Sequence, residues 1–271
     1  MRQFILDKQK ISNGLVQIDG KDFRYLRQVL RVKTGDMLSL RLTNGELVQS
    51  TVAKIDEKAK LVLLQICADS GKCSGEDNRS ITRGVQAAEL NAMDSAPEFW
   101  LFQMITKAPK FEQIVRQATE CGVTKIIPIK GEYSEKSSIL AQEGAKRERL
   151  ERIVKEARQQ SGSPVATEVF PPLSLEEAVS KWNEASDSKL GFVLYERTDR
   201  TVELRDVINQ AGKENIKKVC VCCGCEGGIS PAEIEFLCEK GLFHPIHFAV
   251  NILRAETAAL YGLAAVQTSI L

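Results

Sequence analysis

The chain has 271 residues, 43% of them hydrophobic, and a formal net charge of +1. Its length exceeds that of a typical single domain, and its apolar residues suffice for packed cores. Charged residues interrupt the first ten positions, and no apolar run approaches the ~20 residues of a membrane span. We therefore expect a cytoplasmic protein without a secretion signal or membrane anchor, whose eight cysteines are free thiols.

Five short strand-like runs, split by Asn-Gly and Gly-Asp turn signals, come first in chain order. Their ranges are 3–6, 15–18, 37–42, 46–55 and 61–67. Short strands separated by turns indicate a small β-barrel. We assign this barrel to residues 1–72.

Positive charge is concentrated in this first region. Residues 1–72 hold 13 Lys plus Arg against 8 Asp plus Glu, a net of +5, which leaves −4 for residues 73–271. Lys21, Arg24, Arg27 and Arg31 follow one another at helical spacings of three and four, which predicts a basic stripe on one helix face. Such a stripe suits RNA phosphates, although a solvated surface helix gives the same pattern.

The second region has the pattern of an α/β domain. A polar stretch rich in glycine and serine precedes it, and we predict a linker and entry segment over 73–97. From residue 98 to 271, strand-like runs alternate with helical stretches, which favours a parallel sheet. The predicted strands are 99–105, 125–129, 190–195, 219–223 and 243–250, and the predicted helices include 110–121 and 142–160.

Two strand-to-helix turns near the end of the chain point to a ligand site. The first contains Gly224, Gly227 and Gly228, and glycines allow close approach of backbone to a ligand. A capping box at Ser230 predicts the helix that follows. The second turn starts at Asn251, where we predict a helix start.

Ligands of open parallel sheets bind beyond the carboxyl ends of the strands, where both turns fall. The spacing of the glycines does not fit a dinucleotide fingerprint, and no phosphate loop is present.

Several segments carry a resemblance to a known family. Residues 224–234 read GCEGGISPAEI, residues 252–258 read ILRAETA, and residues 23–36 read FRYLRQVLRVKTGD. Residues 107–110 (KAPK), 118–123 (ATECGV) and 156–162 (EARQQSG) extend the likeness over nearly the whole chain. The sequence resembles the trefoil-knot SPOUT methyltransferases, specifically the family that methylates N3 of a uridine in 16S ribosomal RNA.

This resemblance implies a fold, a cofactor and partners. The fold would be a parallel-sheet SPOUT methyltransferase domain with a C-terminal knot, joined to an N-terminal PUA-like β-barrel. The cofactor would be S-adenosyl-L-methionine. The partners would be 16S ribosomal RNA, within the small ribosomal subunit, and a second copy of the chain in a homodimer.

The resemblance also implies site residues. Candidate catalytic residues are Arg254, Glu226 and Glu256. Candidate cofactor-binding residues are Leu194, Tyr195, Gly224, Glu226, Gly227, Gly228, Phe248, Ala249, Ile252 and Leu253. Candidate RNA-binding residues are Arg2, Arg24, Arg27, Arg31, Lys107 and Lys110. Arginine keeps its charge and offers fixed donors, so Arg254 suits the developing negative charge of the base.

Some positions depart from the family pattern and keep an alternative open. Cys225 stands where proline is usual, Ala249 where glycine is usual, and Asn251 where a basic residue is usual. Loss of proline would loosen the glycine turn, and the Ala249 methyl group would crowd the cofactor. The alternative is a catalytically degenerate RNA-binding protein of ribosome assembly.

Four closely spaced cysteines suggest a second alternative, a cysteine-based metal or redox protein. They are Cys220, Cys222, Cys223 and Cys225. Structural zinc sites usually separate paired cysteines by two to four residues, and neighbours on a strand point to opposite faces. We therefore predict that these cysteines fill a core strand, and that His244 and His247, at odd spacing in a strand, point apart. No metal site is assigned.

Overall fold

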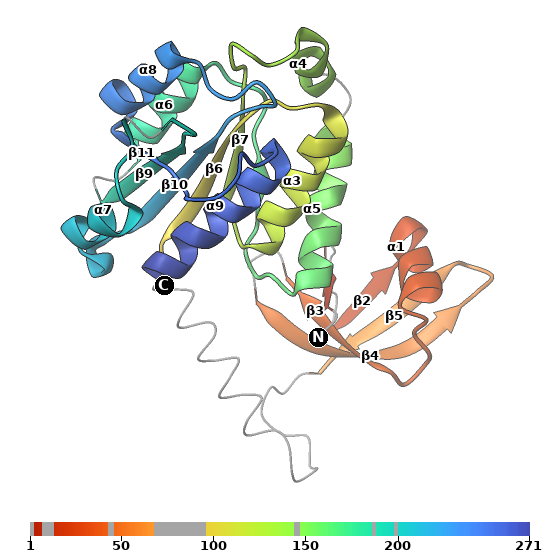
Figure 1. Ribbon diagram of the computed structural model, residues 1–271. Coiled ribbons are helices and arrows are strands. Elements are labelled where there is room, and N and C mark those ends of the chain that lie inside the picture. Colours follow the sequence, from red (N-terminus) through yellow and green to blue (C-terminus); the bar gives the residue numbers. More distant parts are fainter. Residues whose placement is uncertain are drawn as a thin grey trace. The chain divides into compact units, whose positions relative to one another are not determined.

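The computed structural model of the chain describes residues 3–6, 14–42, 46–67, 96–143, 147–185, 188–197 and 200–271 (Figure 1). The chain forms two compact units, which are described separately. The first comprises Met1–Val85 with Arg158–Pro164, and the second comprises Gln86–Ala157 with Val165–Leu271. Arg2 and all but the last two positions of the linker predicted at 73–97 lie outside the described residues.

The first unit is built on a five-stranded sheet of order β1-β3-β4-β5-β2. The strands are β1 (Gln3–Ile5), β2 (Leu15–Ile18), β3 (Met37–Arg41), β4 (Leu47–Asp56) and β5 (Leu61–Ile66). All five lie within one or two residues of the predicted runs. Only β1 and β3 pair in parallel, and the other pairs are antiparallel. Phe4, Leu40 and Leu64 are fully buried in its core.

The basic helix of this unit differs from the prediction. An α-helical turn, α1 (Gly20–Arg24), continues as a π-helical turn, η1 (Tyr25–Val29), in which the Leu30 N–H donates to the Tyr25 carbonyl at 3.1 Å. Arg31 then has a left-handed backbone with φ of 54° and lies beyond the helix. The wider π turn and the left-handed residue redirect the side chains that follow.

The predicted stripe of four cations on one helix face is therefore wrong. Lys21, Arg24 and Arg31 are exposed, but Arg27 is half-buried, donates to the Val32 carbonyl and forms an ion pair with Glu57. The positive charge of the unit remains, but it is not arranged along a single helix face.

The second unit is a six-stranded sheet of order β11-β9-β10-β6-β7-β8, with every pair parallel. Its strands are β6 (Glu98–Met104), β7 (Lys125–Ile129), β8 (Glu168–Val169), β9 (Lys189–Leu194), β10 (Lys218–Cys223) and β11 (Phe243–Ile246). Its helices are α3 (Ala108–Glu120), α4 (Lys136–Glu143), α5 (Arg147–Ser161), α6 (Leu175–Asn183), α7 (Leu204–Ala211), the short η3 (Lys213–Asn215), α8 (Pro231–Gly241) and α9 (Ala255–Ile270).

Helices cover both faces of this sheet (Figure 1). Side chains from α3, α5, α7 and α9 pack in one core, and side chains from α6 and α8 pack in the other. Strand β10 lies between them, so its alternate side chains enter opposite cores. Val219, Val221 and Cys223 face the first core, whereas Cys220 and Cys222 face the second. This confirms that the strand cysteines are core residues.

Local sequence signals correctly predicted the start of α8 and the end of α3. Ser230 and Glu233 form the reciprocal bonds of a capping box at the start of α8. Gly122, with φ of 74°, follows the last turn of α3. The predicted helix 142–160 is wrong at its start, because α4 ends at Glu143 and α5 begins at Arg147. The two-residue strand β8 is too short for its pattern to be recognised.

The segment after β11 also differs from the prediction. The strand stops at Ile246 rather than at residue 250, and α9 begins at Ala255 rather than at Asn251. Phe248, Val250 and Ile252 alternate with other residues as in a strand, but all three line a pocket instead of a sheet. The apolar alternation of these residues therefore reflects their place in the pocket lining, and not pairing in a sheet.

Candidate functional site

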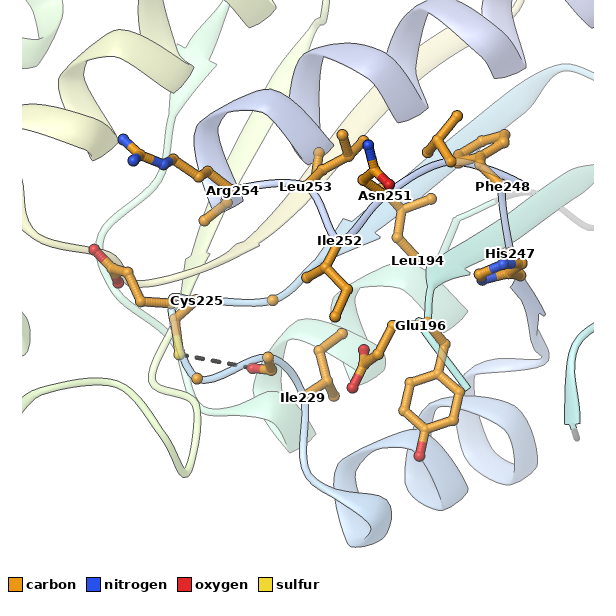
Figure 2. A pocket seen from close by; sticks show the side chains of 18 of the residues that line it. Leu194, Glu196, Cys225, Ile229, His247, Phe248, Asn251, Ile252, Leu253 and Arg254 are labelled. Atoms are coloured by element: carbon orange, nitrogen blue, oxygen red, sulfur yellow. Dashed lines mark hydrogen bonds between the residues drawn. The ribbon is translucent and has the colours of Figure 1, made fainter. Parts of the chain in front are cut away.

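Three segments that leave neighbouring strands at their carboxyl ends line one pocket (Figure 2). They are residues 194–196 at the end of β9, residues 224–229 after β10, and residues 246–248 and 250–255, which run from the end of β11 to the start of α9. The cavity measures about 500 Å³, which lies within the range of small-molecule sites, roughly 300–1,000 Å³. The expectation that the two predicted turns lie at the same end of the sheet is confirmed.

The turn after β10 requires its glycines for three different reasons. A Cβ atom on Gly224 would lie 2.7 Å from the Gly228 carbonyl carbon. A Cβ atom on Gly227 would lie 2.8 Å from the Tyr133 Cβ, and Gly228 has φ of 81°. The Gln103 side chain donates to the Gly224 carbonyl at 3.0 Å. The turn is therefore closely packed against its own backbone and against the sheet.

Cys225 closes the same turn. Its residue is only 6% exposed, its Sγ donates to the Gly228 carbonyl at 3.6 Å, and the Gly228 N–H donates to the Cys225 carbonyl at 3.0 Å. Figure 2 shows the thiol contact as a dashed line. Burial is the main cause that raises the pKa of this thiol. Cys225 thus holds the turn closed through one side-chain contact and one backbone contact. The absence of proline at this position had instead predicted a loose turn.

The four clustered cysteines should resist alkylation in the folded protein at pH 7–8. Burial raises the pKa of each thiol, with Cys220, Cys222 and Cys223 completely buried, so little thiolate forms. Time-resolved iodoacetamide labelling with peptide mass spectrometry measures this, and the unfolded protein serves as the fully reactive control. Rapid labelling of the cluster at neutral pH would instead support the cysteine-based redox hypothesis.

The histidines and cysteines do not converge on a metal site. Within the described ranges, no group of three or more His, Cys, Asp or Glu side chains is arranged to hold a metal ion. His244 lies in β11 with its ring centroid 6.2 Å from that of Phe192, and burial lowers its pKa. His247 lies beyond the strand and lines the pocket. The prediction that both histidines belong to one strand is wrong, because β11 ends at Ile246.

Lys110 connects two of the candidate catalytic residues. Its Nζ lies 3.3 Å from Glu226 Oε1 and 3.7 Å from Glu256 Oε2. Glu256 Oε2 is buried and accepts no hydrogen bond within the described residues. Lys110 was predicted to contact RNA, and the structure places it in the pocket wall as the counter-ion of both glutamates.

Glu226 is held in its charged form. Burial alone raises the pKa of its carboxyl group. Hydrogen bonds from its own N–H, from the Lys107 N–H and from Lys110, with the positive charge of Lys110, outweigh burial and lower the pKa below its ordinary value. The Lys107 N–H contact measures 3.3 Å. A carboxylate with a lowered pKa is a weak proton acceptor near neutral pH, so Glu226 suits anchoring of the turn better than general base catalysis.

Arg254 is a cation at the edge of the pocket, and none of the described residues is its counter-ion. It is exposed and precedes the first residue of α9, with no capping bond from its side chain. Figure 2 shows its guanidinium extending away from Ile252 and Asn251. In the described part of the chain it forms no ion pair or hydrogen bond through its side chain. Its donors are therefore available to a ligand.

Most of the predicted pocket residues meet here. Those that line the cavity are Leu194, Tyr195, Gly224, Glu226, Gly227, Gly228, Phe248, Ile252, Leu253 and Arg254. Ala249 and Glu256 do not line it, and Ala249 is exposed. Sequence reasoning missed His247 and Val250, which lie in the segment that was predicted as the end of a strand. Lys107 is exposed and pairs with Glu135 at 3.2 Å, while Arg24, Arg27 and Arg31 belong to the first unit.

Comparison with protein-family models defines the class. A model described as RNA methyltransferase domain matches residues 94–267, and one described as RNA methyltransferase PUA domain matches residues 18–65. The fold agrees with a crystal structure from Neisseria gonorrhoeae, a ribosomal RNA small subunit methyltransferase E bound to S-adenosyl methionine. That structure has a TM-score of 0.74 at 22% identity and covers 99% of this chain and 97% of its own. The predicted SPOUT fold class with a PUA-like domain is confirmed.

Curated relatives identify the family within that class. The ribosomal RNA small subunit methyltransferase E of Aquifex aeolicus is 30% identical over 236 residues, which cover 84% of this chain and 93% of the relative. The methyltransferase E 2 of Borreliella burgdorferi is 27% identical over 270 residues, which cover 97% and 96%. The chain belongs to the ribosomal RNA small subunit methyltransferase E family.

No helix among the described residues combines the length and the apolar character needed to cross a membrane.

Proposed function

We propose that this protein transfers a methyl group from S-adenosylmethionine to N3 of a uridine in 16S ribosomal RNA of the small subunit. Family membership supports ribosomal RNA methylation, and the sequence resemblance supports uridine N3 as the acceptor atom. The observation that carries the proposal is the pocket itself, where three strand-end segments meet beside Arg254, an arginine for which the described residues supply no counter-ion. Such a pocket provides a cofactor site and a substrate-facing cation together.

The pocket residues fit the cofactor. The apolar residues Leu194, Ile252 and Leu253 line the pocket (Figure 2) and suit an adenine ring. Within the described residues, the backbone N–H groups of Ile252 and Leu253 donate to no backbone carbonyl, so they are available to ring nitrogens. Gly228 leaves an open approach, because a Cβ atom there would meet only Glu196 Oε1, at 3.9 Å.

Glu196 supplies the complementary charge. Figure 2 shows its carboxylate beside Ile229, on the side of the pocket that faces Ile252. A carboxylate accepts hydrogen bonds from ribose hydroxyls or from an amino group. When bound, S-adenosylmethionine supplies an electrophilic methyl group on a positively charged sulfur.

Arg254 is proposed to stabilise the reacting base. The N3 proton passes to solvent water, and its loss leaves negative charge on the two neighbouring carbonyl oxygens of the uracil. A guanidinium presents donors in a fixed fork and stays charged, so it favours that anion more than the neutral base. Glu226 holds the glycine turn, and Glu256 holds Lys110. Positioning of the base against the methyl group lowers the barrier further, by roughly 7–11 kcal/mol in favourable cases.

The first unit is proposed to bind RNA phosphates through its exposed cations, including Arg24 and Arg31. Its match to a PUA domain of RNA methyltransferases supports this role. We also propose that the active form is a homodimer, as the family resemblance implies. Sedimentation analysis of the full chain measures the oligomeric state directly.

The function is tested with labelled S-adenosylmethionine and small ribosomal subunits that lack the uridine-N3 methyl group. Nuclease digestion and chromatography then identify the labelled nucleoside. Label in N3-methyluridine is the expected result. Label in another nucleoside would exclude uridine N3 as the acceptor atom but would still support an RNA methyltransferase. Cofactor and RNA binding without any transfer would instead support the degenerate RNA-binding protein.

Replacing Ala249 by glycine should leave cofactor affinity unchanged within about twofold. The Ala249 methyl group is exposed and does not line the pocket, so its removal opens no space for the ligand. Isothermal titration of wild type and Ala249→Gly with S-adenosylmethionine measures the difference. An affinity gain of tenfold or more, about 1.4 kcal/mol, would show that the methyl group obstructs the cofactor after all.

A further inference from the structure

A loop outside the pocket lining holds an exposed aromatic side chain against the glycine turn. Tyr133 lies in the loop between β7 and α4 and is 46% exposed. A Cβ atom on Gly227 would lie 2.8 Å from the Tyr133 Cβ and 3.3 Å from its Cγ. The base of the tyrosine side chain is thus packed on a residue that lines the pocket, while much of the residue remains in contact with solvent.

The loop is anchored at several points, which fixes the position of Tyr133. The Glu132 N–H donates to Glu233 Oε1 at 2.8 Å, and Glu233 is itself held by the capping box of α8. The Ser134 N–H donates to the Gly131 carbonyl at 3.0 Å. Glu135 pairs with Lys107 at 3.2 Å. A side chain on such a backbone loses little entropy when a ligand binds to it.

The Tyr133 ring pairs with none of the described residues. Several other aromatic residues of this unit pair with one another, as Trp100 does with Trp182 and Phe248 does with Tyr261. In the part of the chain that the structure describes, Tyr133 forms no ring pair, no cation–π contact and no side-chain hydrogen bond. Packing on Gly227 requires only bulk near the Cβ atom, so it does not explain an exposed aromatic ring.

Three cations lie in or beside the pocket that this loop adjoins. Lys107 is exposed, its N–H contacts Glu226 in the glycine turn, and its side chain reaches Glu135 in the tyrosine loop. Lys110 and Arg254 line the adjoining pocket. An exposed aromatic ring next to a positively charged groove is the pattern by which proteins bind unstacked nucleotides, with the base on the ring and the phosphates near the charges.

We infer that Tyr133 is an RNA-binding residue that stacks on a nucleobase next to the target nucleotide. This inference rests on the proposed function. Tyr133 adjoins the pocket without lining it, so the base that it stacks on lies outside the pocket, whereas the target base enters it. Extrusion of the target base breaks its stacking with a neighbour, and the tyrosine ring replaces that lost contact.

Two variants separate stacking from packing. Tyr133→Phe keeps the aromatic face, and Tyr133→Leu keeps bulk on Gly227 but removes the face. Base stacking on an aromatic residue contributes about 5- to 150-fold in affinity. We expect Tyr133→Leu to raise the KM for small ribosomal subunits by a factor in this range, with kcat and the Kd of S-adenosylmethionine within about twofold. Tyr133→Phe should resemble wild type.

Two results would overturn the inference. An unchanged KM in Tyr133→Leu would exclude stacking. Loss of cofactor binding in Tyr133→Leu, with Tyr133→Phe normal, would show that the ring supports the glycine turn instead. Failure of the proposed function is distinct, because the wild type itself would then transfer no methyl group. In that case, binding of fluorescein-labelled 16S RNA fragments by the same variants decides the role of Tyr133.

Discussion

Replacement of Arg254 by alanine is expected to lower the rate of methyl transfer by about 10²- to 10³-fold, the usual effect of removing one donor to a developing anion. Arg254 has no counter-ion in the described structure, so its whole charge is available to the substrate. Its side chain extends away from Ile252 (Figure 2), so cofactor affinity should change little. Single-turnover assays at saturating S-adenosylmethionine, with parallel titration of the cofactor, measure both quantities.

Two further variants help to explain the lower rate of methyl transfer that we expect for Arg254→Ala. Arg254→Lys keeps the charge but not the planar fork, so an intermediate rate indicates that both contribute. Arg152→Ala is the matched control, because Arg152 is exposed on α5 and, within the described residues, pairs only with Glu156, at 3.7 Å. It should transfer methyl groups at the wild-type rate. If Arg254→Ala also kept that rate, Arg254 would have no role in the reaction.

The features that sequence predicted well depend on local patterns. Strand positions follow from short apolar runs, and the start of α8 follows from the Ser230 to Glu233 capping box. The alternation of the cysteines in β10 follows from the two-residue period of a strand between two cores. Each of these signals is contained in ten or fewer consecutive residues, so no knowledge of distant contacts is needed.

The features that sequence missed depend on distant contacts. Phe248, Val250 and Ile252 show the same alternation whether they line a sheet or a pocket, and only the third dimension distinguishes the two. Lys110 lies more than a hundred positions before Glu226 and Glu256 in the chain, so its pairing with them has no local signal. Arg31 does not lie on the predicted basic helix face, because its backbone is left-handed. The residue type alone does not reveal that conformation.

Replacement of Gly224 by alanine is expected to abolish measurable cofactor binding and to destabilise the fold by about 1–3 kcal/mol, the usual cost of overpacking. The added Cβ atom would lie 2.7 Å from the carbonyl carbon of Gly228 and 2.9 Å from its oxygen, and neither backbone atom can rotate away. The turn must therefore open, which moves the backbone on which the ligand rests. Isothermal titration with S-adenosylmethionine and urea unfolding measure the two effects.

Gly262→Ala provides the matched comparison, because it adds the same atom near the same pocket. There the new Cβ atom would lie 2.6 Å from Leu194 Cδ1, the far end of a flexible side chain that can rotate. Its effect on cofactor affinity should therefore be clearly smaller than that of Gly224→Ala. Equal losses would mean that the pocket responds to any added volume. A loss confined to Gly224→Ala would locate the requirement in the backbone of the turn, where a side chain at Gly224 cannot be accommodated.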